Sequence, residues 1–303
     1  MRTENQHYIP QSYLRLFSED QKSIWVYDKT TKIIRHQKII GTGTIKNFYT
    51  SIRHPQPLDI GIVTQLEGDG ISIIKKIDDK QAVTAEELGK LLNFLALQLL
   101  RTPTSKEKIE ATFQLFWKEL RKRYNDPHFD NHKKAEKIAE NFIKERSIKN
   151  VSPKDFLNSE VPPSFPEEFF VDVIAKHGFK ITEILSKQKW EWLFAQPDIW
   201  LTSDNPFSIF DPNDKNTFPN LSSNIRKIIP LSKKTLAVIE GEGFKLKMKQ
   251  VYPWAVRVIN LATASKAKQY VYSGSKKLLQ EIASELPDFE HDPSTFIEIK
   301  SKK

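Results

Sequence analysis

The stretch that most constrains this fold is residues 85–100, which would be apolar on nearly every side as a helix. Its second half reads LLNFLALQLL. Thr84 and Glu87 have the spacing of a capping box, in which the two side chains satisfy the first free amides of a helix. A helix that is hydrophobic all round must be buried. Other elements of the chain therefore have to surround this one.

Strand patterns occur toward both ends of the chain. Residues 23–29 and 33–38 are rich in β-branched and aromatic residues and flank a polar turn, which predicts a hairpin. Residues 190–196 and 199–202 show a similar pattern around Pro197, and we expect them to pair as a second hairpin. Short β-rich runs continue from there toward the C-terminus.

The middle of the chain has helical periodicity. Apolar residues recur at three- and four-residue spacing, which predicts helices over residues 58–77, 105–124 and 166–186. Strands at both ends around a helical middle predict an α+β fold, with a mainly antiparallel sheet built from N- and C-terminal segments. We predict a single integrated domain over residues 1–303, a helical insertion over about 58–188 and a loosely ordered tail over about 287–303.

The residue composition excludes several classes of protein. The chain has 303 residues and no cysteine, which rules out disulfides, thiolate nucleophiles and cysteine-bound metal centres. A chain without cysteine fits a reducing compartment, so we expect a cytoplasmic protein. The first residues lack the apolar core of a secretory signal. The longest apolar run, near residues 91–100, is too short to cross a bilayer, so we expect no membrane partner.

The chain is basic, with a formal net charge of +9 and a sequence pI of about 9.3. A surplus of positive charge can concentrate nucleic acid or another polyanion at a protein surface. Much of the surplus is lysine in predicted solvated helices and at the C-terminus, so ordinary surface charge is the alternative. Net charge alone leaves both interpretations open.

Polar and aromatic residues gather around Pro10, near the N-terminus. Pro10 suits the first turn of a helix, and Tyr13 lies on the apolar face of the short helix predicted to follow. His7 lies just before that helix, where the helix dipole disfavours a cation. We therefore expect a neutral imidazole, which can act as a base or a ligand. The alternative is a structural histidine that fixes the N-terminus. Tyr8 and Gln11 complete this candidate site.

A second group of polar residues falls within apolar helices. Gln98 and Arg101 are three residues apart and share a face. An arginine at a buried helix end requires an acid or a phosphate, and Glu67 and Asp204 are the candidate acids. Glu67 lies on an apolar helix face, so it is either buried with a partner or lines a cavity. The alternatives are a solvated position for Glu67 and an internal ion pair that only joins helices.

A third group lies where a predicted strand ends in Ser203-Asp204-Asn205-Pro206. Such a turn presents a hydroxyl, a carboxylate and an amide together, and binding groups are common in loops of this kind. The same residue types are also good turn formers, so a purely structural turn is the alternative. A metal site at Asp204 would need a second ligand such as Glu67 or His7.

Several short motifs occur in a fixed order along the chain. The opening HYIPQSYLRLF covers residues 7–17 and is followed by IWVYD, FYT, LEG, LRTP and LTSDNP, the last ending at residue 206. In this order they resemble the bacterial domain-of-unknown-function family 4238, over nearly all of the chain. The opening motif is more specific than the later ones. The resemblance implies an intracellular prokaryotic protein, and it supplies no established activity or catalytic residues.

Two functions are compatible with these residues. The first is a nucleic-acid hydrolase that uses Mg²⁺ or Mn²⁺, with His7 as base or ligand and Arg101 as a phosphate clamp. Its predicted catalytic residues are His7, Gln11, Glu67, Arg101 and Asp204, with Asp204 and Glu67 as metal ligands, and its predicted binding residues are Tyr8, Tyr13, Gln98, Ser203 and Asn205. The second is a non-catalytic basic binding or regulatory protein in which the same motifs are structural. The oligomeric state is left open.

Overall fold

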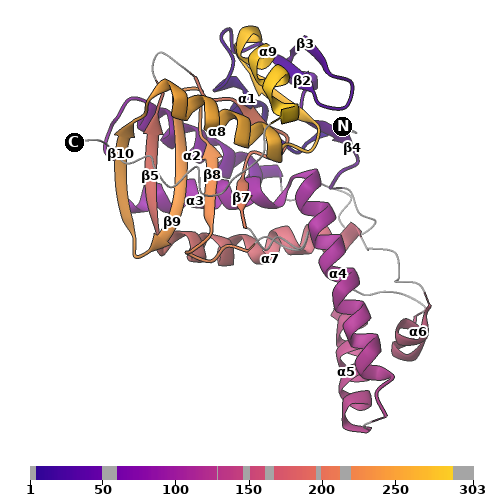
Figure 1. Cartoon of the computed structure of the whole chain (residues 1–303). Helices are drawn as coiled ribbons and strands as arrows, with labels where there is room; N and C mark the ends of the chain where they lie inside the picture. Colours follow the sequence, from indigo (N-terminus) through magenta and orange to yellow (C-terminus); the bar gives the residue numbers. More distant parts are fainter. Residues whose placement is uncertain are drawn as a thin grey trace.

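The fold is α+β, as predicted, with mostly antiparallel sheets flanking a helical middle (Figure 1). The computed structural model describes residues 5–49, 60–127, 129–145, 151–160, 167–195, 199–211 and 220–288. Within these residues, the N-terminal elements are β1 (Asn5–His7), α1 (Gln11–Arg15), β2 (Ser23–Asp28), β3 (Ile33–Lys38) and β4 (Thr44–Lys46).

The helical middle runs from α2 to α7 and confirms the prediction for this part of the chain. Its helices are α2 (Ile60–Asp78), α3 (Ala85–Leu100), α4 (Pro103–Tyr124), α5 (Phe129–Glu145), α6 (Pro153–Asn158) and α7 (Glu167–Ser186). The capping box at the start of α3 is present, with Thr84 accepting from the Glu87 amide and Glu87 accepting from the Thr84 amide. Of the helices described here, none is both long and apolar enough to cross a membrane.

The C-terminal part supplies most of the strands. Its elements are β5 (Gln188–Phe194), β6 (Thr202–Ser203), β7 (Ser208–Phe210), β8 (Arg226–Pro230), β9 (Thr235–Glu242), β10 (Lys245–Gln250), α8 (Pro253–Lys266), β11 (Tyr270–Ser273) and α9 (Lys276–Glu285). The strands in the described residues form a β1-β4 pair, a four-stranded sheet β3-β2-β11-β6 and a five-stranded sheet β10-β5-β9-β8-β7.

The four-stranded sheet joins the two ends of the chain. The predicted β2–β3 hairpin is confirmed, with Ser23 opposite Lys38. β2 also pairs with the C-terminal strand β11, which in turn pairs with β6. The predicted hairpin between residues 190–196 and 199–202 is wrong. β5 pairs with β9 and β10 instead, while β6 lies in the other sheet.

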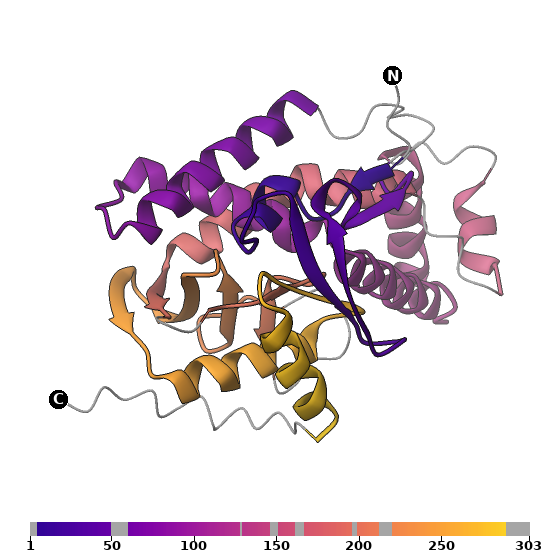
Figure 2. The same ribbon diagram turned by 90° about the horizontal axis from the view of Figure 1, so that it is seen from above.

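The core lies between the five-stranded sheet and helices α2, α3 and α7. Trp190 and Trp192 of β5 point to this side and share a buried cluster with eight residues of α3. The opposite face of the same sheet carries α8, which packs against Leu193 and Ile228. Figure 2 shows α2 and α3 side by side, with α8 on the other side of the sheet. The all-round apolar sequence of α3 is explained by this central position.

Helices α4 and α5 project away from the sheets as an arm, to which α6 adds a short helix (Figure 1). The arm has a core of its own, including Trp117 and Phe156. α6 falls in a proline-containing stretch whose composition is that of a linker. Ser152 caps α6 and forms a capping box with Asp155. At the other end of the chain, the predicted loose tail falls almost entirely on residues 289–303, outside the described residues.

Candidate functional site

His7 ends β1, where it lies opposite Thr44 of β4. Its ring is half-buried, and its Nε2 is 3.2 Å from the carbonyl oxygen of Ile40. A carbonyl oxygen only accepts hydrogen bonds, so the Nε2 atom carries the proton. Burial lowers the pKa of His7 below its usual 6.5, which favours the neutral ring. His7 is therefore a neutral imidazole with its lone pair on Nδ1, the form expected of a base or ligand.

This assignment predicts a pH dependence of stability. Because the pKa of His7 is lower in the folded state, the unfolded state binds the proton first as the pH falls below 6.5. The free energy of unfolding should therefore fall more steeply from pH 6.5 to 5 in the wild type than in His7→Gln. Urea unfolding at several pH values measures both slopes. Parallel curves would contradict a buried, neutral His7.

Arg101 joins two helices at the inner end of the candidate site. It is the residue that follows α3, and its side chain is 3% exposed. Its Nη1 donates to Glu67 Oε1 of α2 over 2.6 Å, and its Nε donates to Gln98 Oε1 over 2.7 Å. Of the two candidate acids, Glu67 is thus the one paired with Arg101. Glu67 is 25% exposed, so this ion pair lies between the interior and the surface.

Two hydrogen-bond donors in this group have no partner within the described part of the chain. They are Arg101 Nη2 and Gln98 Nε2, and both atoms are buried. Buried polar atoms are nearly always hydrogen-bonded, and a missing bond costs about 1 to 3 kcal/mol. A bound molecule with acceptor oxygens would satisfy both donors. These two donors mark a place where the described residues supply no acceptor.

The charged groups around His7 belong to one neighbourhood. Glu67 raises the pKa of His7, while Arg101 and Arg15 lower it, each by an effect smaller than that of burial. Arg15 is exposed on α1 and donates through Nη2 to Gln11 Oε1 over 3.1 Å. We call His7, Gln11, Arg15, Glu67, Gln98 and Arg101 the polar cluster. Arg15 was not predicted, although its position one turn after Gln11 on α1 was available from the sequence.

Asp204 is held in a different place and in a different way. Its side chain accepts hydrogen bonds from the backbone amides of Lys268, Gln269 and Tyr270, over 2.7 to 2.9 Å. The residue is 2% exposed. Burial raises the pKa of Asp204, and the three amides oppose that shift. The carboxylate thus fixes the loop that leads from α8 into β11.

The neighbours of Asp204 are also occupied within the fold. Ser203 Oγ accepts from the amide of Asn205, whose side-chain amide donates to the Lys266 carbonyl over 3.1 Å. These bonds tie the turn after β6 to the end of α8. The contacts favour the structural interpretation of the turn, and a binding role for Ser203 and Asn205 stays a prediction.

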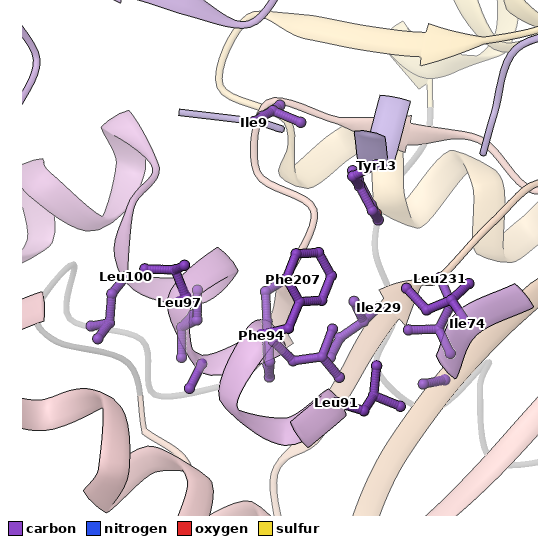
Figure 3. Packing of buried hydrophobic residues seen from close by; sticks show 14 of the residues in the cluster. Ile9, Tyr13, Ile74, Leu91, Phe94, Leu97, Leu100, Phe207, Ile229 and Leu231 are labelled. Atoms are coloured by element: carbon purple, nitrogen blue, oxygen red, sulfur yellow. The ribbon is translucent and has the colours of Figure 1, made fainter. Parts of the chain in front are cut away.

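The two predicted binding tyrosines join the N-terminal segment to the sheets. Tyr8 is buried and hydrogen-bonds to the hydroxyl of Tyr272 in β11. Tyr13 Oη donates to the Pro230 carbonyl over 2.5 Å and lies 3.0 Å from Thr202 Oγ1. Figure 3 shows Tyr13 above the core, on the side of Phe94 and Phe207. Burial raises the pKa of both tyrosines, so they are hydrogen-bonding hydroxyls at neutral pH.

The predicted metal site has no complete ligand set among the residues that the structure describes. No three histidine, aspartate or glutamate side chains come together there. Glu67 is paired with Arg101, and Asp204 is engaged by three amides. His7 lies on a strand of the β1–β4 pair rather than in the sheet that contains Ser203. Metal binding by Asp204 and Glu67 therefore stays a prediction.

Comparison with known proteins gives a family. The family model described as a protein of unknown function, DUF4238, matches residues 5–277. This range includes the whole polar cluster and the turn at Asp204. No curated protein and no solved structure matches the chain.

Proposed function

We propose that this chain, which belongs to the DUF4238 family, binds a phosphate group of nucleic acid at its polar cluster. The observation that carries the proposal is a pair of buried donors, Arg101 Nη2 and Gln98 Nε2, for which the described residues provide no partner. Phosphate oxygens are strong acceptors, and the planar arginine fork suits them. Arg15, exposed on α1, adds positive charge at the outer side of the cluster.

A second candidate function is hydrolysis of the bound phosphodiester, which the state of His7 favours. A neutral imidazole with a free Nδ1 lone pair can take a proton from an attacking water. Mg²⁺ commonly binds one or two carboxylates together with substrate phosphates and water. Glu67 is the carboxylate of the cluster, and it would have to serve a Mg²⁺ or Mn²⁺ ion while paired with Arg101. Asp204, engaged by amides, would be a positioning residue in this scheme.

The decisive variant is Gln98→Glu. It keeps the oxygen that accepts from Arg101 Nε and replaces Nε2, the donor left unpaired by the described residues, with a second oxygen that shares the negative charge. Binding of inorganic phosphate and of a dinucleotide, measured by calorimetry, should weaken at least tenfold. Loss of one such charge-assisted bond costs about 1.5 to 3 kcal/mol. Arg123→Gln is the control, because this exposed arginine pairs only with Glu119 on α4 in the described contacts. Equal binding by Gln98→Glu and the wild type would refute the proposal.

The hydrolase candidate is tested separately with His7→Gln. Labelled DNA and RNA are incubated with pure protein and Mg²⁺ or Mn²⁺, with EDTA as the negative control. If His7 is the base, metal-dependent cleavage should fall about 100-fold or more in His7→Gln while phosphate binding persists. An absence of cleavage by the wild type, together with phosphate binding, would leave a binding protein and remove the hydrolase.

A further inference from the structure

A second charged surface lies on the five-stranded sheet, away from every residue of the polar cluster. It surrounds a cavity of about 270 Å³. We call it the basic groove, and its charged lining residues are Lys189, Glu191, Arg226, Glu240, Lys245, Lys247 and Lys249. Apolar residues such as Val238 and Ile259 line the rest.

The alternation of β10 explains why its lysines line one surface. Successive side chains of a strand point to opposite faces, so Lys245, Lys247 and Lys249 share a face, and all three line the groove. β10 pairs in parallel with β5, which sets Lys245 beside Lys189 and Lys247 beside Glu191. Helix α8 covers the neighbouring part of this face (Figure 1). The charged part of the sheet remains open next to the helix.

Positive charge is in excess in the groove, with five cations and two carboxylates in its lining. Glu191 is shared by Lys249, at 3.0 Å, and Lys247, at 3.9 Å. Glu240 pairs with Arg226 at 2.6 Å. In the described residues, Lys189 and Lys245 have no acidic partner, and both are exposed neighbours on adjacent strands. Like charges in such positions repel each other, and an anion between them would remove that repulsion.

Protection of a sheet edge accounts for only part of this charge. Lysines on an edge strand discourage pairing with another chain, and β10 is an edge strand. Lys189 lies on the inner strand β5, and Arg226 lies on β8, where edge protection is not needed. Because of Lys189 and Arg226, the positively charged surface extends from the edge strand onto the inner strands of the sheet.

We propose that the basic groove binds the phosphate backbone of a nucleic acid. Lysines at every second residue of a strand are about 6.6 Å apart, and such a row suits a polymer of regularly spaced charges better than a single small anion. The net charge of +9 would strengthen the attraction. The groove shares no residue with the polar cluster, so this inference goes beyond the function proposed above and stands even if the cluster binds no phosphate.

The test measures binding of a fluorescently labelled 20-nucleotide strand and a 20-base-pair duplex by anisotropy, over a range of NaCl concentrations. The groove variant is Lys189→Glu with Lys245→Glu. The matched control is Lys118→Glu with Lys122→Glu, two exposed lysines of α4 with the same change in net charge. All four positions are exposed, and thermal melting verifies that both variants fold.

The groove variant should bind at least one of the two probes tenfold or more weakly. The slope of log K against log [NaCl] should become shallower by about two, which corresponds to two lost phosphate contacts. The α4 control should change less than threefold. An equal loss in both variants would show that bulk charge is responsible and overturn the proposal, as would a wild type that binds neither probe. Selective binding to phosphatidylserine vesicles would overturn it in favour of a membrane surface.

The same titrations separate this inference from the function of the polar cluster. Gln98→Glu leaves every groove residue unchanged. Both sites are supported if each variant weakens a different kind of binding. In that case Gln98→Glu weakens dinucleotide binding only, and the groove variant weakens binding of the long probes only. If only the groove variant has an effect, the groove stands and the proposal for the cluster fails.

Discussion

Replacing Asp204 with alanine is expected to lower the free energy of unfolding by about 4 kcal/mol. The change leaves the amides of Lys268, Gln269 and Tyr270 without their acceptor. A hydrogen bond to a charged group contributes about 1.5 to 3 kcal/mol, and an unmet buried donor costs about 1 to 3 kcal/mol. Three lost hydrogen bonds could together cost more than this. We expect a value toward the low end of that range because water can reach part of the loop and bind to the freed amides.

Urea unfolding of Asp204→Ala measures this effect, and Asp204→Asn should lose less because one acceptor oxygen remains. Asp79→Ala is the matched control, since Asp79 is an exposed aspartate, and such a change usually shifts stability by less than about 0.5 kcal/mol. A fully stable Asp204→Ala would contradict the structural role. If that stable variant also lost phosphate binding or cleavage, the turn would belong to the functional site.

Gly70→Ala is expected to destabilise the protein by about 3 kcal/mol, the upper part of the usual range for overpacking a core. A Cβ atom at Gly70 would overlap Cγ of Phe94, on the neighbouring helix α3, and would lie 2.6 Å from Cβ of the same residue. Phe94 is fully buried among Tyr13, Phe207 and Ile229 (Figure 3). Neither helix can retreat without opening the core, so the added methyl group has no space.

Gly68 offers a control on the same helix. A Cβ atom there meets nothing within 4 Å, so Gly68→Ala should stabilise the protein by about 0.5 to 1 kcal/mol through helix propensity. Gly70→Ala should cost less in a Phe94→Ala background than in the wild type, because Phe94→Ala removes Cγ and Cδ1 from the contact. A Gly70→Ala variant as stable as Gly68→Ala, measured by urea unfolding, would contradict the close approach of α2 and α3.

The sequence predicted those elements whose signals are local. The start of α3 follows from Thr84 and Glu87, and the β2–β3 hairpin from residues within one short segment. The partners of β5 could not be predicted, because β9 and β10 lie about fifty residues away and β6 is only two residues long. Helix α6 was missed because prolines outweighed the capping signal of Ser152 and Asp155.

The contacts of the candidate site were likewise predictable in part, where the signal in the sequence was local. The pairing of Arg101 with Gln98 and Glu67 was predictable, because a polar residue on an apolar helix face needs a polar neighbour. The contacts of Asp204 were not, since the same residue type serves in turns and in ligand sites. The basic groove was missed because it depends on Lys189 and Lys245 being neighbours, and only the register of β5 with β10 shows that.

The pairing of β2 with β11 has a consequence for how the protein is made. Tyr270 lies opposite Asp28, so 270 − 28 = 242 residues must be added after Asp28 before that pair can form. At about 5 to 20 residues per second, translation takes roughly 12 to 50 s to cover this distance. During that time Ile24 and Val26, buried in the finished protein, lie on a strand that lacks its C-terminal neighbour. The nascent chain therefore presents an unpaired strand edge until the segment that contains β11 has been made, and a chaperone that shields this edge should raise the yield of folded protein.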